Sequence, residues 1–170
     1  MILDDILGRL FKNDRKPDFC EIRQSFIDYV KLESDILKVC DFDKKRNNGI
    51  YIGYNPNNRN MPTYFLSAGF NDAHSDLENV TLYASWVTRY DPKILDSHYS
   101  PLESHKEKIE KLFDFRKLDF LNIGGAHKIG VSQYHVDLTD KENIHSHFKW
   151  LRHNLEKLYW LIRIHENGCI

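Results

Sequence analysis

The chain has 170 residues, with 24 Lys and Arg against 25 Asp and Glu, a formal net charge of −1 and a mean hydropathy of −0.57. This length suits one domain, and the balanced charge argues against a dedicated nonspecific nucleic-acid binder. No apolar run approaches the roughly 20 residues that span a bilayer, and the acidic start of the chain lacks the positive region of a signal peptide. The three cysteines show neither a disulfide framework nor a zinc spacing. The sequence therefore predicts a cytoplasmic protein.

The first part of the chain predicts two helices. Apolar residues at helical spacing indicate a short amphipathic helix over residues 2–11, which we interpret as the core of an N-terminal arm, residues 1–17. Asp18 stands three residues before Glu21, as in a capping box, and predicts a helix from Phe19 to Lys38. Residues 18–170 are expected to form a single domain.

Strands and further helices follow. Segments rich in aromatic and β-branched residues predict strands over 49–55, 63–70, 79–87, 117–125 and 128–138. Ser100, followed by Pro101 and then Glu103, predicts a helix that runs to Phe113. Thr139 and Glu142 form a second capping-box pattern, which predicts a final helix over 140–165.

The order of these elements is α-α-β-β-β-α-β-β-α. The strands arrive in hairpin-sized groups, without strand–helix–strand alternation. This order favours an α+β fold in which helices pack on a mostly antiparallel sheet of about five strands.

The second half of the chain carries motifs of a known family. After the strand over 79–87 come a helix motif from Lys106 to Glu110, a strand from Lys117 to Phe120, a segment from His135 to Asp140 and a closing helix motif from Trp150 to Lys157. This arrangement resembles the bacterial family known as domain of unknown function 4268. Members of that family are frequently found beside restriction-type or other phage-defence nuclease domains. The resemblance implies an accessory or recognition module, and it supplies no active site.

One segment resembles part of a nuclease motif. In Asp41-Phe42-Asp43-Lys44-Lys45, an acid-x-Lys pattern is present, in which a carboxylate holds Mg²⁺ and a lysine helps to position water. The pattern belongs on a strand, whereas here it lies in a charged turn after a helix. We interpret it as a solvated turn and keep a metal-dependent nuclease, using Asp43 and Lys45, as the less favoured alternative.

Histidines offer no clear metal site. His145 and His147 would face the same way on a strand, but in a helix they lie about 200° apart and cannot share a metal ion. The capping pattern at Thr139 places both in the final helix. No nucleophile has a recognisable neighbouring base, so we assign no catalytic residue, no metal ligand and no cofactor.

Basic and aromatic residues cluster around the first strands. A basic loop beside aromatic strand residues is typical of sheets that hold single-stranded nucleic acid. The sequence therefore predicts a hypothetical set of nucleic-acid-binding residues. The alternative is that they are ordinary surface side chains of a hairpin. Its members are Lys44, Lys45, Arg46, Arg59, Tyr51 and Tyr54.

The final helix has two apolar sides. Its core stripe is Ile144, Phe148, Leu151, Leu155, Leu158 and Ile162. The opposite side carries Trp150, Trp160 and Ile164, with His153 and Lys157 among them. Either the N-terminal helix, Ile2 to Leu10, folds over this side, or it is a homodimer or partner interface.

These observations favour a non-enzymatic module that binds a macromolecule. It would act as an accessory or recognition module in a bacterial or phage conflict system. The alternative is a stand-alone inhibitor or immunity protein that binds one toxin or effector. The expected partner is a protein, or a second copy bound through the C-terminal helix; nucleic acid is left open, and no membrane is expected.

Overall fold

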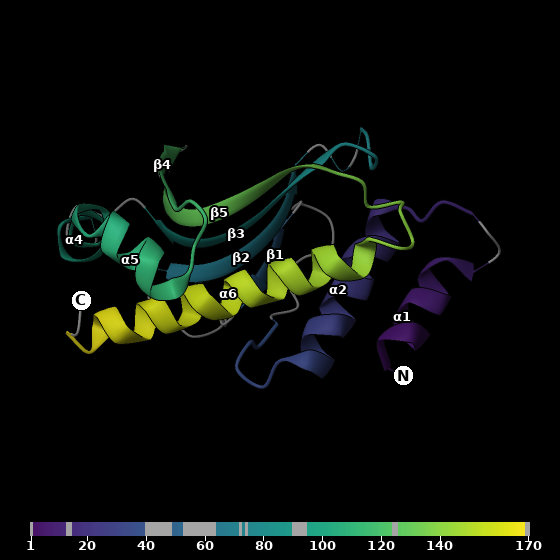
Figure 1. Ribbon diagram of the computed structural model, residues 1–170, viewed down its shortest axis with the longest axis horizontal. Coiled ribbons are helices and arrows are strands. Elements are labelled where there is room, and N and C mark those ends of the chain that lie inside the picture. Colours follow the sequence, from purple (N-terminus) through teal and green to yellow (C-terminus); the bar gives the residue numbers. More distant parts are fainter. Residues whose placement is uncertain are drawn as a thin grey trace.

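The computed structural model describes residues 2–12, 15–39, 49–52, 64–71, 73, 75–89, 95–123 and 126–168 (Figure 1). The helical elements are α1 (Ile2–Leu10), α2 (Phe19–Glu33), the π-helical turn η2 (Leu95–Tyr99), α4 (Ser100–Ser104), α5 (Lys106–Phe113) and α6 (Ile144–Glu166). The strands are β1 (Gly49–Ile52), β2 (Tyr64–Asn71), β3 (Val80–Arg89), β4 (Asp119–Ile123) and β5 (Ala126–Val136). Within the described ranges, no helix is both long and apolar enough to cross a membrane.

The strands pair antiparallel in one sheet with the order β1-β2-β3-β5-β4. The α+β class and the antiparallel sheet are therefore confirmed. Strands β3 and β4 follow one another along the chain but are not neighbours in the sheet, because β5 lies between them. Residues 90–118 connect the two strands. This crossover contains η2, α4 and α5.

Aromatic side chains join the sheet to the helices on one face. The Phe26 ring of α2 lies 6.2 Å from Phe70 on β2 and 5.3 Å from Phe148 on α6, both in edge-to-face geometry. All three side chains are fully buried. Figure 1 shows α2 and α6 together below the strands, so the core lies between these helices and one face of the sheet.

The apolar stripe of α6 is the part of the prediction that the structure confirms most directly. Six residues at helical spacing are all buried: Ile144, Phe148, Leu151, Leu155, Leu158 and Ile162. A long helix that lies along a sheet buries one stripe over its whole length.

Helix α2 starts as predicted and ends early. Asp18 accepts a hydrogen bond from Glu21 N at 2.9 Å, and Glu21 in turn accepts from Asp18 N at 2.9 Å, so the capping box is present. The predicted end at Lys38 is wrong, because Ser34 is extended and its side chain accepts from Leu37 N.

The predicted helix 100–113 is two short helices. The Ser104 hydroxyl and the His105 ring both bond to the carbonyl oxygen of Pro101, at 2.7 and 2.9 Å. These side chains compete with the backbone for that acceptor, and the helix breaks at His105 before α5 begins.

The final helix begins at Ile144, so the predicted start at residue 140 is wrong. Thr139 donates its hydroxyl to Asp137, at 2.7 Å, and forms no capping box with Glu142. Asp140 instead accepts from the backbone of Glu142 and from the Asn143 side chain, which stabilises a turn before the helix.

The N-terminal helix packs on α2. Ile6 and Leu10 are buried and belong to the same core cluster as the sheet residues. Figure 1 shows α1 beside α2 and far from the C-terminal half of α6. Helix α1 therefore does not cover Trp160.

Candidate functional site

The sheet has a second face, opposite the helices. Along β3, Val80, Leu82, Ala84 and Trp86 are buried toward the core, so the alternate residues face the other way. The crossover also packs on the core side, where Tyr99 of η2 contacts Phe120 and His127. In the part of the chain that the structure describes, the helices thus gather on one face and leave the other open.

A pocket of about 260 Å³ is hollowed into this open face. We call it the sheet-face pocket. It is lined by Asn71, Thr81, Tyr83, Ala84, Ser85, Asp119, Leu121, Lys128, Gly130, Val131, Ser132 and Tyr134.

The hollow exists because small residues meet at its floor. Ser85 of β3 is in register with Ser67 of β2 and with Gly130 of β5, and Gly130 is in register with Asp119 of β4. Larger side chains occupy the neighbouring positions, so the row of small residues forms a depression across the sheet.

Ser85 supplies an unsatisfied hydroxyl in this pocket. The residue is only 4% exposed, and its Oγ has no hydrogen-bond partner among the described residues. A buried hydroxyl normally finds a partner, because leaving it unpaired costs about 1–3 kcal/mol. The hydroxyl is therefore available to a ligand.

An aromatic ring covers a glycine of the sheet next to this floor. The Tyr83 ring covers Gly69 of β2, where any Cβ atom would overlap the ring. The Lys128 ammonium stands 5.9 Å from the centre of the same ring. The pocket thus combines an aromatic surface with a cation above it.

Two exposed side chains rim the pocket. Tyr134 is 62% exposed and Leu121 is 42% exposed. Tyr134 continues the alternation of Gly130 and Ser132 on the open face, and a β-bulge between β3 and β5, with His135 at φ 56°, then turns Val136 back into the core. His135 Nδ1 lies 3.0 Å from Asn79 Oδ1, which stabilises the bulge.

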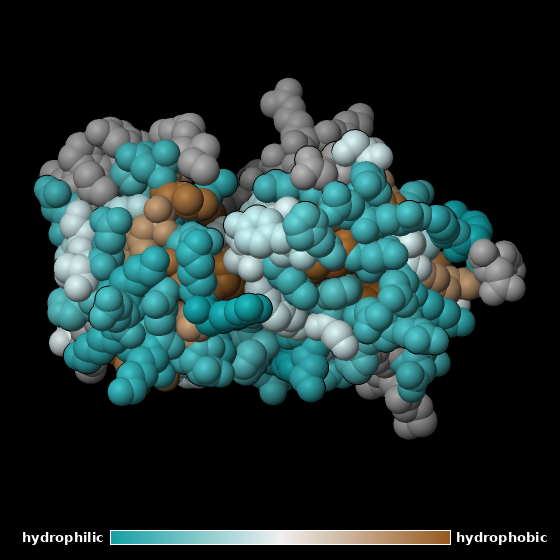
Figure 2. Space-filling view, turned by 45° about the horizontal axis from the view of Figure 1, so that its top comes forward, coloured by the Kyte–Doolittle hydropathy of each residue, from teal (hydrophilic) through white to brown (hydrophobic). Residues whose placement is uncertain are grey.

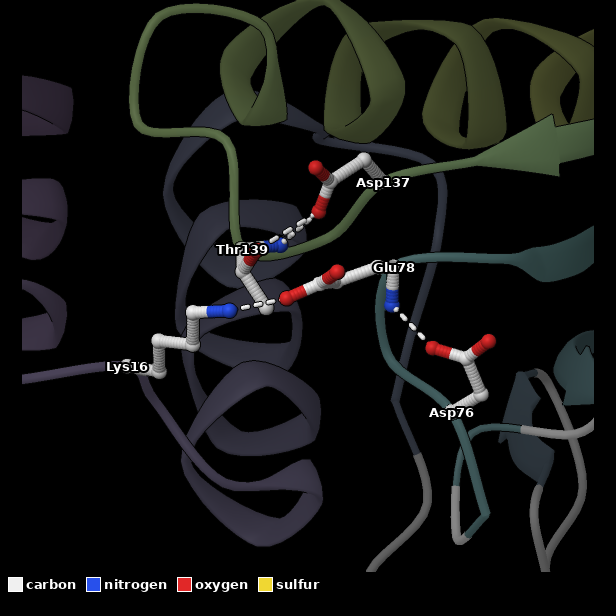
Figure 3. A network of polar contacts seen from close by, with 5 residues as sticks. All are labelled: Lys16, Asp76, Glu78, Asp137 and Thr139. Atoms are coloured by element: carbon white, nitrogen blue, oxygen red, sulfur yellow. Dashed lines mark hydrogen bonds and ion pairs between the residues drawn. The ribbon is translucent and has the colours of Figure 1, made fainter.

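A second hollow, of about 580 Å³, lies at the start of α2. Figure 3 shows the polar contacts of this region. Lys16 forms an ion pair with Glu78, which raises the pKa of Lys16. Asp76 accepts from Glu78 N at 2.9 Å, and Asp137 accepts from Thr139 N at 2.7 Å. These carboxylates stabilise the turns that bring three chain segments together, so this hollow is explained by the fold.

Within the described ranges, no group of three or more His, Cys, Asp or Glu side chains is placed to hold a metal ion. His145 and His147 both lie in α6, as the sequence predicts. Cys20 is exposed at the start of α2.

The nucleic-acid-binding set from the sequence falls almost wholly outside the described residues. Lys44, Lys45, Arg46, Tyr54 and Arg59 lie there, as does Asp43 of the acid-x-Lys pattern. Tyr51 lies in β1, in register with Ser67, on the same row of positions as Ser85.

On the side of α6 opposite the core stripe, some side chains pack against the protein and others are exposed to solvent. Lys157 donates to the carbonyl oxygen of Asp114 at 2.7 Å, and its ammonium lies 5.4 Å from the Phe115 ring centre. Trp150 and Ile164 are half-buried and His153 is exposed. Trp160 is 50% exposed. On the face drawn in Figure 2, hydrophobic side chains lie in separate patches on a mainly hydrophilic surface.

Sequence reasoning missed the sheet-face pocket. Its residues come from four strands, and only the register brings them together. The signal in the sequence is the alternation of Tyr83 and Ser85 in β3, and of Lys128, Gly130 and Ser132 in β5, with buried apolar residues.

No protein-family model, no curated protein and no solved structure matches the chain. The resemblance to the family known as domain of unknown function 4268 therefore rests on the sequence motifs alone.

Proposed function

We propose that the protein is a non-enzymatic macromolecule-binding module that acts beside a nuclease in a bacterial or phage conflict system, and that the open sheet face is its binding surface. The observation that carries the binding surface is the sheet-face pocket, with the buried, unpartnered hydroxyl of Ser85 at its floor. The biological setting is supported by the family resemblance in the second half of the chain.

The rim of the pocket supports the same surface. Large apolar side chains exposed on a folded domain are typical of binding sites when they lie beside polar groups that fix orientation. Tyr134 and Leu121 fulfil this description, because both stand beside Lys128 and Ser132.

A second candidate is the stand-alone inhibitor or immunity protein, which would bind a toxin or effector through α6. Trp160 favours it, because a half-exposed indole is typical of the anchors that dominate protein interfaces. Lys157 is held by the segment after α5, so this surface would centre on Trp160.

Recovery of tagged protein from a bacterial lysate distinguishes the two. One variant carries Leu121→Asp with Tyr134→Asp, and the other carries Trp160→Ser; all three side chains are exposed, so both variants should fold. Loss of the bound macromolecule in the first variant alone supports the sheet face. Loss in the Trp160→Ser variant alone supports the inhibitor, and retention in both overturns both surfaces.

A further inference from the structure

The sheet-face pocket offers a complement to each part of a nucleotide. A nucleotide has a flat aromatic base, a hydroxyl-bearing sugar and an anionic phosphate, and proteins bind these by aromatic stacking, by hydrogen bonds and by lysine or arginine. We propose that this pocket binds one nucleotide of a single-stranded nucleic acid whose backbone runs across the open face. This inference rests on the proposed function, since it names the ligand class of the same surface.

Two tyrosines supply the aromatic surface. Tyr134 is 62% exposed at the rim, and the Tyr83 ring covers Gly69 at the side of the pocket toward β2. A base that enters between them can stack on a ring without any particular sequence, because every base has a π-face.

Lys128 supplies the charge. Lys117 forms an ion pair with Asp119 at 3.4 Å. Lys128 lies over the Tyr83 ring, and among the described residues no carboxylate stands within salt-bridge distance of its ammonium. Its charge is therefore not neutralised locally and is available to a phosphate.

Polar groups at the floor supply the hydrogen bonds. The Ser85 hydroxyl is buried and has no hydrogen-bond partner in the part of the chain that the structure describes, and Ser132, Thr81 and Asn71 line the same pocket. A base edge or a sugar hydroxyl that reaches Ser85 would satisfy it, which would remove the cost of its burial.

The position of the pocket distinguishes this ligand from a peptide or a duplex. An extended peptide adds to a sheet by pairing with the backbone of an edge strand, whereas most residues of the pocket belong to β3 and β5, which are interior strands, and β4 at the edge contributes only Asp119 and Leu121. A base paired in a duplex is stacked on both faces and cannot lie on a tyrosine at the floor of a hollow. Single strands therefore fit this site best.

The test measures fluorescence anisotropy of a labelled single-stranded oligodeoxythymidine of about 12 nucleotides, a length within the site sizes of such proteins. Tyr134→Ala should weaken binding roughly tenfold, since one stacked base is lost. Lys128→Ala should weaken binding and flatten the dependence of log affinity on log salt by about 0.7. Lys149→Ala, an exposed lysine on α6, is the charge-matched control and should change neither the affinity nor the salt slope beyond error.

Other outcomes overturn the inference in distinguishable ways. If the oligonucleotide does not bind, but the sheet-face variant still loses a protein from the lysate, the surface is a protein-binding site and the nucleotide assignment fails. If the oligonucleotide binds and the Tyr134 and Lys128 variants match the wild type, another surface binds it. Equal affinity for a duplex of the same length contradicts a pocket for an unpaired base.

Discussion

His165 near the end of α6 shares a hydrogen bond with His98 of η2, with 3.0 Å between Nε2 of the first and Nδ1 of the second. His165 Nε2 also lies 3.2 Å from the carbonyl oxygen of Ser97. A carbonyl oxygen only accepts, so His165 Nε2 carries the proton and His98 Nδ1 accepts. The pair joins the crossover to the C-terminal helix, and it requires a neutral His98.

This pair makes stability depend on pH. Burial, and then the charge of His165, hold the pKa of His98 below its usual value of 6.5. Burial also lowers the pKa of His147. A histidine whose pKa is lower in the folded than in the unfolded state stabilises the folded state at pH values above its pKa in the unfolded state. This stabilisation is lost as the pH falls through its lower pKa in the folded state. The melting temperature should therefore fall as pH is lowered from about 7 to about 5.

The His98→Asn variant tests whether the titration of His98 contributes to this pH dependence. Its amide oxygen can take the place of Nδ1 and accept from His165, but the residue no longer titrates. Circular dichroism melts at several pH values should give a flatter profile for the variant than for the wild type. Parallel profiles would show that His98 does not contribute to the pH dependence.

The aromatic contact between Phe26 and Phe148 should be a main source of stability. Both rings are fully buried, at 5.3 Å between centroids, between the sheet and the two long helices. Phe148→Ala should lower the free energy of unfolding by about 3–5 kcal/mol, because it leaves a cavity that the surroundings fill only in part. Urea unfolding measures this change. Leu112→Ala, at an exposed position on α5, is the control and should change the free energy by less than about 1 kcal/mol.

The capping box at the start of α2 should contribute a smaller amount. Asp18→Ala removes the acceptor for Glu21 N and should cost about 1 kcal/mol. Asp18→Asn keeps an acceptor oxygen and should recover most of that loss. If the two variants unfold at the same urea concentration, the cap does not stabilise the helix.

The sequence predicted what depends on local pattern. The α6 stripe from Ile144 to Ile162 and the capping box of Asp18 and Glu21 follow from residues three or four positions apart. The second capping pattern failed, because Asp137 accepts from Thr139 N and Asp140 accepts from Glu142 N, and these are the two backbone donors that the box would satisfy. Residue spacing alone does not show which side chain a backbone donor will choose.

The candidate site was not predictable in the same way. Ser85, Gly130 and Asp119 become neighbours only because β5 pairs with β3 on one side and β4 on the other. Nothing local in the sequence specifies that strand order. The bulge at His135, which turns Val136 back into the core, also depends on the partner strand.

Two glycines on the open face should respond differently to the same substitution. At Gly69, the three atoms nearest to an added Cβ all belong to the ring end of the Tyr83 side chain, which can rotate away. At Gly130, it meets the carbonyl oxygen of Ala84 and, at 2.8 and 2.9 Å, Cβ and Cα of Ser85. Backbone atoms of the central strand cannot move without disturbing the pairing of β3 with β5.

Gly130→Ala should therefore lower the free energy of unfolding by about 1–3 kcal/mol, whereas Gly69→Ala should lower it by less than about 1 kcal/mol. Urea unfolding of the two variants measures the difference. Because the displaced Tyr83 ring lies beneath Lys128, Gly69→Ala should also change oligonucleotide affinity while stability is nearly kept. An equal loss of stability in both variants would show that the Tyr83 ring is as firmly held as the backbone, and an unchanged affinity would show that this ring is no part of the binding surface.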